Sequence, residues 1–193
     1  MPGNVSEVID QVFELLQRSG GEEYFGEPVS KLQHAEQCAA HAEKAGADEE
    51  LILASLLHDI GHLLEVDGAL RDERVGVINH DEVGQAWLRS RGFSVRLAAL
   101  VGGHVDAKRY LTAMNPGYLA RLSPASIETL RLQGGPMNEA SAAAFAEAPD
   151  LRDLLRLRSW DEMAKDPNWE GPGLESYREM LVRHLEAQVS RSI

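Results

Sequence analysis

Cysteine is almost absent from this sequence: among 193 residues only Cys38 carries a thiol. A single cysteine excludes an intramolecular disulfide and fits a reducing compartment. No apolar run approaches the roughly 20 residues that cross a bilayer as a helix, and no signal peptide is visible at the first residues. We therefore expect a cytoplasmic protein that does not bind a membrane.

Positive charge is also scarce. The chain has 19 Lys and Arg against 31 Asp and Glu, a formal net charge of -12 at pH 7, and its sequence contains no basic block. This balance argues against nucleic acid or an anionic membrane surface as a partner, so we expect a small-molecule ligand. The length suits one compact domain, and we interpret residues 1–193 as a single domain.

The sequence lacks strand-like alternation, repeats and low-complexity tracts, whereas apolar residues recur with the helical period along most of it. Ser30 and Gln33 predict a capping box, and Asp48, Asn138 and Asp150 are expected to cap further helices. The sequence therefore predicts an all-α fold, with helices over about residues 5–18, 31–45, 49–62, 80–91, 95–104, 124–133, from 139, from 151 and over 176–189.

An adjacent histidine and aspartate, His58 and Asp59, follow the apolar run over residues 51–57. An imidazole and a carboxylate beside a hydrophobic core need partners, and a shared metal ion supplies them for both. A lone histidine in such a place is more often a hydrogen-bonded core residue. Three more histidines, however, lie beside apolar residues in other predicted helices: His34, His80 and His104. Four together with an aspartate favour a metal site.

Consecutive helical residues point about 100° apart. His58 and Asp59 can therefore serve one metal centre only near the end of their helix, with the Asp59 carboxylate as a bridge. Nitrogen and oxygen ligands suit Fe and Mn and do not exclude Zn or Co. Cys38 is better explained by packing than as a ligand.

Together with Asp161, these residues make a pattern that resembles the HD-domain superfamily, whose motif is H...HD...D. The resemblance covers about residues 30–165 and implies an HD-type helical bundle. The two additional histidines imply a dinuclear site. One ion would be held by His34, His58, Asp59 and Asp161, and the other by Asp59, His80 and His104, with Asp59 shared.

Four longer motifs carry a closer resemblance: residues 24–27 (YFGE), 103–110 (GHVDAKRY), 133–137 (QGGPM) and 158–162 (RSWDE). With them the chain resembles the small HD-domain mixed-valent diiron oxygenases, which cleave the carbon–phosphorus bond of 1-hydroxy-2-aminoethylphosphonates. The resemblance implies two iron ions in an Fe(II)/Fe(III) state, with dioxygen and an organophosphonate as substrates.

The spacing of two cations suits a phosphonate dianion. Lys108 follows His104 by one helical turn and Arg158 precedes Asp161 by three residues, so both are expected on the side of the ligands. A solvated surface charge is the competing interpretation of Lys108. Ser126, near a helix start, adds a hydroxyl and a share of the helix dipole.

The resemblance also implies roles for residues to which spacing alone assigns none. A phenol at Tyr24 would occupy an open iron position at rest, and the Glu27 carboxylate would receive the substrate ammonium. His62, one turn after His58, is expected to hydrogen-bond the substrate or to orient another group. Asp106 would help to hold a quaternary ammonium, or would pair with a nearby Lys or Arg.

The predicted reaction is oxygen-dependent cleavage of (R)-1-hydroxy-2-(trimethylammonio)ethylphosphonate to glycine betaine and phosphate. The same reaction on (R)-2-amino-1-hydroxyethylphosphonate, giving glycine, is the first alternative. A metal-dependent phosphohydrolase of the HD type is the second, since a metal-bound water can attack a phosphate ester. A non-catalytic sensor would not need open metal positions.

Overall fold

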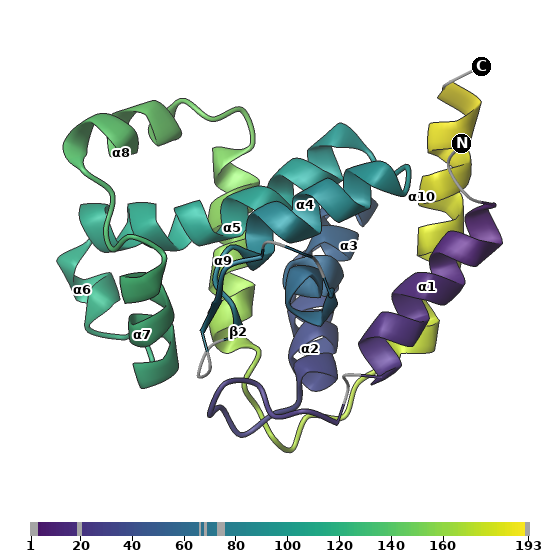
Figure 1. The fold of residues 1–193 in the computed structure, drawn as a ribbon, viewed down its shortest axis with the longest axis horizontal. Helices are drawn as coiled ribbons and strands as arrows, with labels where there is room; N and C mark the ends of the chain where they lie inside the picture. Colours follow the sequence, from purple (N-terminus) through teal and green to yellow (C-terminus); the bar gives the residue numbers. More distant parts are fainter. Residues whose placement is uncertain (1–3, 19–20, 66, 68, 73–75, 192–193) are drawn as a thin grey trace.

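The computed structural model describes residues 4–18, 21–65, 67, 69–72 and 76–191, and within them the chain is mainly helical, as predicted (Figure 1). The α-helices are α1 Val5–Arg18, α2 Lys31–Lys44, α3 Glu49–Leu57, α4 His80–Ser90, α5 Val95–Met114, α6 Pro116–Leu119, α7 Pro124–Leu132, α8 Glu139–Ala146, α9 Leu151–Met163 and α10 Arg178–Arg191. Two 3₁₀ turns are η1 Ile60–Leu63 and η2 Leu174–Tyr177.

One small sheet was not expected. Strand β1, Arg71–Asp72, pairs antiparallel with β2, Gly76–Val77. Strands of two residues are too short to show an alternating pattern in the sequence. Ser19 and Gly20, where the first helix was expected to end, lie outside the described residues.

Most of the predicted helix starts are confirmed by cap geometry. Ser30 accepts from the Gln33 backbone while the Gln33 side chain bonds the Ser30 backbone, so the capping box is present. Asp48 and Asn138 also accept cap hydrogen bonds. The expectation for Asp150 was wrong: it precedes α9, but its side chain makes no cap bond and accepts instead from Arg96 Nε at 3.4 Å.

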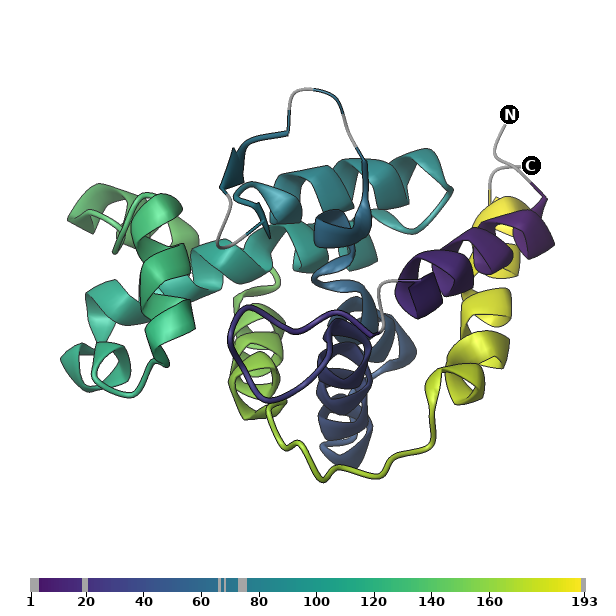
Figure 2. The ribbon, with the colours of Figure 1, turned by 60° about the horizontal axis from the view of Figure 1, so that its bottom comes forward.

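Helix α3 runs through the middle of the molecule. Every residue from Leu51 to Leu57 is buried, as expected for a helix that is apolar on all sides. Helices α2, α5 and α9 pack around it, α4 packs on α5 and η1, and α1 lies beside α10 at one end (Figures 1 and 2). His58 and Asp59, which directly follow α3, therefore lie at the centre of the fold.

The third predicted helix ends earlier than expected. It was predicted to continue to residue 62, but α3 ends at Leu57, and His58 and Asp59 form a turn before η1. This places both side chains at the helix end, where a bridging carboxylate is geometrically possible. A Cβ on Gly61 would lie 1.9 Å from the His80 carbonyl oxygen, so only glycine lets η1 approach the start of α4 this closely.

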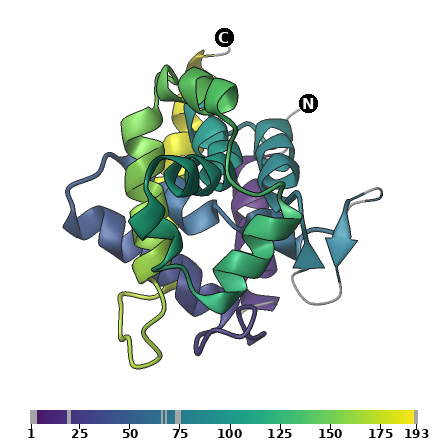
Figure 3. The same cartoon turned by 90° about the vertical axis from the view of Figure 1, so that its left-hand side faces the viewer.

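Helix α5 continues beyond the core and carries an arm built from α6, α7 and α8, which Figure 3 shows from that end of the molecule. The arm has a small core of its own around Tyr118, Leu122 and Leu130. None of the helices in the described ranges has both the length and the apolar character that a bilayer-spanning helix needs.

Candidate metal centre

The fold brings six predicted ligands together from five parts of the chain: His34 on α2, His58 and Asp59 after α3, His80 at the start of α4, His104 on α5 and Asp161 on α9. The four histidines and Asp161 are buried, while the Asp59 side chain is 16% exposed. Segments separated by more than a hundred residues therefore converge on one site.

The Asp59 carboxylate lies between two pairs of histidines. Its Oδ2 is 3.5 Å from His58 Nε2 and 3.9 Å from His34 Nε2. Its Oδ1 is 3.2 Å from His80 Nε2 and 3.6 Å from His104 Nε2. Each oxygen thus faces one pair, which is the arrangement that a bridging carboxylate requires.

Asp161 lies on one side of this bridge only. Its Oδ1 is 3.4 Å from His34 Nε2, and its Oδ2 is 3.9 Å from His58 Nε2. The two predicted ligand groups, one with Asp161 and one without it, are therefore both visible in the geometry.

Backbone carbonyls orient all four imidazoles. A carbonyl oxygen only accepts, so each Nδ1 must donate. His34 Nδ1 donates to the Ala164 carbonyl at 2.9 Å and His58 Nδ1 to the Ser55 carbonyl at 2.8 Å. His80 Nδ1 donates to the Val77 carbonyl at 3.1 Å and His104 Nδ1 to the Val101 carbonyl at 2.6 Å. In a neutral imidazole this leaves Nε2 as an unprotonated lone pair. Such a hydrogen bond from the ring nitrogen that faces away from the metal is typical of metal-ligating histidines.

The lone pairs then face one another across short distances. His34 Nε2 and His58 Nε2 are 3.2 Å apart, and His80 Nε2 and His104 Nε2 are 3.0 Å apart. Asp59 Oδ2, buried between the first pair, has no hydrogen-bond partner among the described residues. Facing lone pairs and an orphaned carboxylate oxygen are unfavourable unless cations lie among them, so these residues fit metal ions.

The carboxylates stay ionised in this buried site. Burial alone would raise the pKa of Asp59 and of Asp161, but adjacent positive charge holds both pKa values well below their usual range: a protonated His58 ring, whose charge a bound cation would replace, for Asp59, and the Arg158 guanidinium for Asp161. Burial raises the pKa of the Cys38 thiol, which is part of the hydrophobic core, in agreement with its interpretation as a packing residue.

A polar pocket opens beside the bridge. The residues that line this polar pocket are Tyr24, Phe25, Asp59, His62, His80, His104, Lys108, Ser126, Thr129, Gln133, Arg158 and Asp161. Lys108, only 4% exposed, donates from Nζ to Thr129 Oγ1 at 2.9 Å. The competing surface interpretation of Lys108 was therefore wrong, because this ammonium is buried at the metal centre.

Thr129 and Gln133 were not assigned a role from the sequence. With Ser126 they occupy positions i, i+3 and i+7, which is the spacing of one helix face. That periodicity on a helix beginning at Ser123 and Pro124 is the signal that would have found them.

Arg158 joins the pocket to a metal ligand. Its Nη1 lies 2.5 Å from Asp161 Oδ2, and its Nε lies 2.9 Å from Glu162 Oε1 and 3.0 Å from the Tyr118 hydroxyl. Tyr118 and Glu162 also hydrogen-bond each other. Arg158 is buried, so these three partners fix the guanidinium.

Aromatic rings close the site on another side. The Tyr24 ring stacks on His34 with centroids 3.9 Å apart, and His62 stacks on His80 at 3.8 Å. Burial and the Asp59 carboxylate raise the pKa of the Tyr24 phenol well above its usual value, so it keeps its proton in this arrangement. Tyr24 and His62 therefore lie beside candidate ligands, and their predicted roles stay predictions.

Two predicted substrate residues have other partners. Glu27 accepts from Lys165 Nζ at 2.7 Å, and neither residue is in the lining of the polar pocket. Asp106 accepts from Arg109 Nη1 at 2.9 Å and faces a separate surface hollow. For Asp106, the structure favours the predicted alternative of pairing with a nearby arginine.

Comparison with known proteins agrees with this geometry. The HD-domain family model matches residues 32–139, which include five of the six candidate ligands. The glycine-betaine-forming 1-hydroxy-2-(trimethylamino)ethylphosphonate dioxygenase of Leisingera caerulea is 39% identical over 184 residues, 95% of this chain and 92% of that protein. The hydroxymethylphosphonate dioxygenase of Gimesia maris is 36% identical over 184 residues, 93% of this chain and 89% of that protein. A protein of Acanthamoeba polyphaga mimivirus is 33% identical over 178 residues, 92% of this chain and 81% of that protein.

An all-α fold with histidines and aspartates gathered around one carboxylate defines a helical protein with a site suited to metal ions. The chain belongs to the HD-domain family, in the group of enzymes that includes these two phosphonate dioxygenases.

If Asp59 is shared, removing its charge should affect both ions. We expect Asp59→Asn to lose both metal ions on dialysis and His104→Ala to lose one, as measured by elemental analysis of iron-loaded protein. Asp10→Asn, at an exposed carboxylate on α1 that pairs with Arg178, is the matched control and should keep its metal. An Asp59→Asn protein with undiminished metal content would show that Asp59 does not bridge.

Proposed function

We propose that the chain is a diiron dioxygenase that cleaves the carbon–phosphorus bond of (R)-1-hydroxy-2-(trimethylammonio)ethylphosphonate, giving glycine betaine and phosphate. The observation that carries this proposal is the position of Lys108 and Arg158 in one pocket with four of the candidate ligands, Asp59, His80, His104 and Asp161. A dianionic head group can lie there beside both metal positions. The names of the relatives in Leisingera caerulea and Gimesia maris support a phosphonate as the substrate.

The atoms of this reaction balance with dioxygen as the only oxidant. Cleavage of the bond between C1 and phosphorus converts a hydroxyphosphonate into a carboxylate and phosphate, which together contain two more oxygen atoms than the substrate. One enters the carboxylate and one the phosphate, while C1 is oxidised and dioxygen is reduced. Iron held by the six candidate ligands would supply this redox chemistry.

The residues of the chain bind and orient the phosphonate. Lys108 offers a buried ammonium, and Ser126 and Thr129 offer hydroxyls from the first turns of α7. Arg158 adds positive charge, although two of its donor atoms are already committed to Asp161 and to the Tyr118–Glu162 pair. We infer that Lys108 makes the main ionic contact with the substrate and that Arg158 mainly positions Asp161.

The cationic tail of the substrate needs a different environment. A trimethylammonium group cannot donate hydrogen bonds and is recognised by aromatic faces and carboxylates. Tyr24 and Phe25 provide aromatic rings in the pocket wall, and Glu27 lies two residues further along the same turn. Lys165 now holds the Glu27 carboxylate, so a cationic tail that reached Glu27 would compete with this ammonium.

The first experiment mixes iron-loaded protein anaerobically with each of three phosphonates and then admits dioxygen. The substrates are the trimethylammonio, the primary amino and the hydroxymethyl compounds, and the assay measures phosphate and the organic acid. We expect oxygen-dependent phosphate release, fastest with the trimethylammonio compound and accompanied by glycine betaine. Phosphate release from simple phosphate esters without dioxygen would instead establish a phosphohydrolase.

The charge of Lys108 should make substrate binding depend on pH. Burial, and secondly the nearby Arg158, lower the pKa of Lys108 to about 7. As pH rises through this value the ammonium loses its proton, so kcat/KM for the phosphonate should fall. Lys108→Arg should remove this fall because arginine stays charged. Lys108→Met should raise KM roughly 100-fold at neutral pH, as expected for losing a charged hydrogen bond. Identical pH profiles for wild type and Lys108→Arg would exclude Lys108 as the titrating group.

If the Lys165 ammonium competes with the cationic tail of the substrate for Glu27, the effect of removing Lys165 on KM should depend on which substrate is used. We expect Lys165→Met to lower KM for the trimethylammonio and amino compounds and to leave KM for hydroxymethylphosphonate, which has no cation, unchanged. Lys44→Met, at the exposed end of α2, removes the same charge from elsewhere. Equal changes in KM for all three substrates would assign Lys165 a purely structural role.

A further inference from the structure

A second cavity meets the polar pocket at the candidate metal centre. The two share one wall, made by Tyr24, Phe25, Asp59 and His62. Beyond this wall their chemistry differs. The polar pocket continues to Lys108 and Arg158, whereas the second cavity, which we call the apolar cavity, continues to Leu16, Ala35, Leu56, Ile60 and Leu63.

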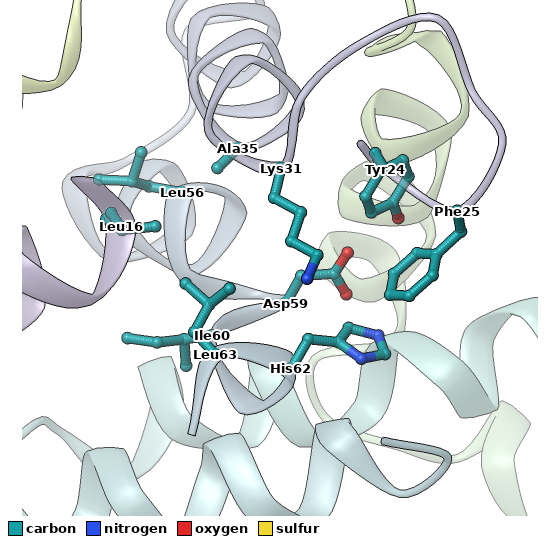
Figure 4. Close-up of a pocket in the computed structure, with 10 residues that line it drawn as sticks. All are labelled: Leu16, Tyr24, Phe25, Lys31, Ala35, Leu56, Asp59, Ile60, His62 and Leu63. Carbon is teal, nitrogen blue, oxygen red and sulfur yellow. The ribbon is translucent and has the colours of Figure 1, made fainter. Parts of the chain in front are cut away.

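The apolar cavity lies inside the packed helices. Its five aliphatic side chains come from α1, α2, α3 and η1, and each is less than 10% exposed. Figure 4 shows them on one side of the cavity and the Tyr24 and Phe25 rings on the other, with the Asp59 carboxylate between them. The apolar cavity therefore extends from α1 to the bridging carboxylate.

Its size and lining restrict what it can hold. The cavity volume of about 10 Å³ is close to the smallest that holds one water-sized molecule, so at most one small molecule fits. A phosphonate is too large, and its charges would lose hydration among leucine and isoleucine side chains. A neutral diatomic gas fits both restrictions, because it needs no hydrogen-bond partner.

Lys31 also lines the apolar cavity. Its Nζ lies 2.5 Å from Glu22 Oε2 and 5.6 Å from the centroid of the Phe25 ring. The aliphatic stem crosses the space between the leucines and the aromatic rings (Figure 4). The charged end is thus held by Glu22 while the stem completes an apolar wall, as is usual for buried lysine stems.

We propose that the apolar cavity binds dioxygen and admits it to the Asp59 side of the metal centre, while the phosphonate uses the polar pocket. This inference rests on the proposed function, since it assigns a place to the second substrate of that reaction. Separate entry would let the gas reach the centre when the anion already fills the polar pocket.

Xenon tests the cavity without any turnover. Xenon is apolar and occupies dry apolar cavities. Crystals of the iron-loaded protein under xenon pressure should show xenon between Leu16, Leu56 and Ile60. Leu16→Phe should fill this space and abolish the xenon site. Leu15→Phe makes the same substitution on the same helix, at a side chain that faces a different hollow, and should keep xenon.

Initial rates at varied dioxygen then test its role. With saturating phosphonate, Leu16→Phe should raise KM for dioxygen several-fold, while kcat at saturating dioxygen and KM for the phosphonate stay near wild type. Leu15→Phe should match wild type in all three. Thermal unfolding of each variant checks that the fold is retained.

The possible failures are distinguishable. Wild-type protein with no xenon in the apolar cavity overturns the inference whether or not Leu16→Phe folds. Xenon lost from Leu16→Phe with an unchanged KM for dioxygen also overturns it and leaves the proposed function standing. Wild-type protein that consumes no dioxygen with any phosphonate overturns the proposed function, and the inference with it.

Discussion

The position of one carboxylate organises this structure. Asp59 is charged and almost enclosed, and its two oxygens face two separate pairs of imidazole nitrogens. A buried carboxylate without partners destabilises the fold, and four imidazole lone pairs that face inward destabilise it for the same reason, because negative charge density gathers at one point. Cations remove both costs at once. Bound cations would therefore link the helices that supply the ligands at this site, while apolar packing holds them together elsewhere.

This division explains why α3 ends where it does. Its apolar residues are buried on all sides and need no polar partner, but the chain must leave the helix to let two adjacent residues face one site. His58 remains close to helical geometry, with φ -57° and ψ -35°, whereas Asp59 departs from it with ψ 9°. The close passage of Gly61 under His80 then brings α4 to the same point. Since unfolded chains lack such a cage, metal binding should add directly to the stability of the fold.

Much of this arrangement could be read from the sequence. The adjacent His58 and Asp59 after an apolar run predicted the buried position, and because consecutive helical residues diverge by about 100° they also predicted that the Asp59 carboxylate lies between the two groups of ligands. The positions of Lys108 and Arg158 followed from helical spacing to His104 and Asp161. In these cases a short stretch of one helix contained the whole signal.

The remainder depended on contacts between distant segments. The Lys165 ammonium that holds Glu27 lies 138 residues away in the chain, so no local pattern could identify it as the partner. Tyr118 reaches Arg158 from a helix in the arm, 40 residues earlier. The pairing of Asp106 with Arg109 was one of two local possibilities, and only the three-dimensional structure distinguishes it from a place at the substrate.

The backbone carbonyls that orient the four histidines make these orientations tolerant of substitutions during evolution. Each hydrogen bond to Nδ1 ends on the main chain, at residues 55, 77, 101 and 164, and not on a side chain. A substitution at any of these positions keeps the acceptor as long as the backbone keeps its path. Mutation can therefore remodel the pocket lining, and with it the choice of substrate, while the histidine orientations are inherited unchanged.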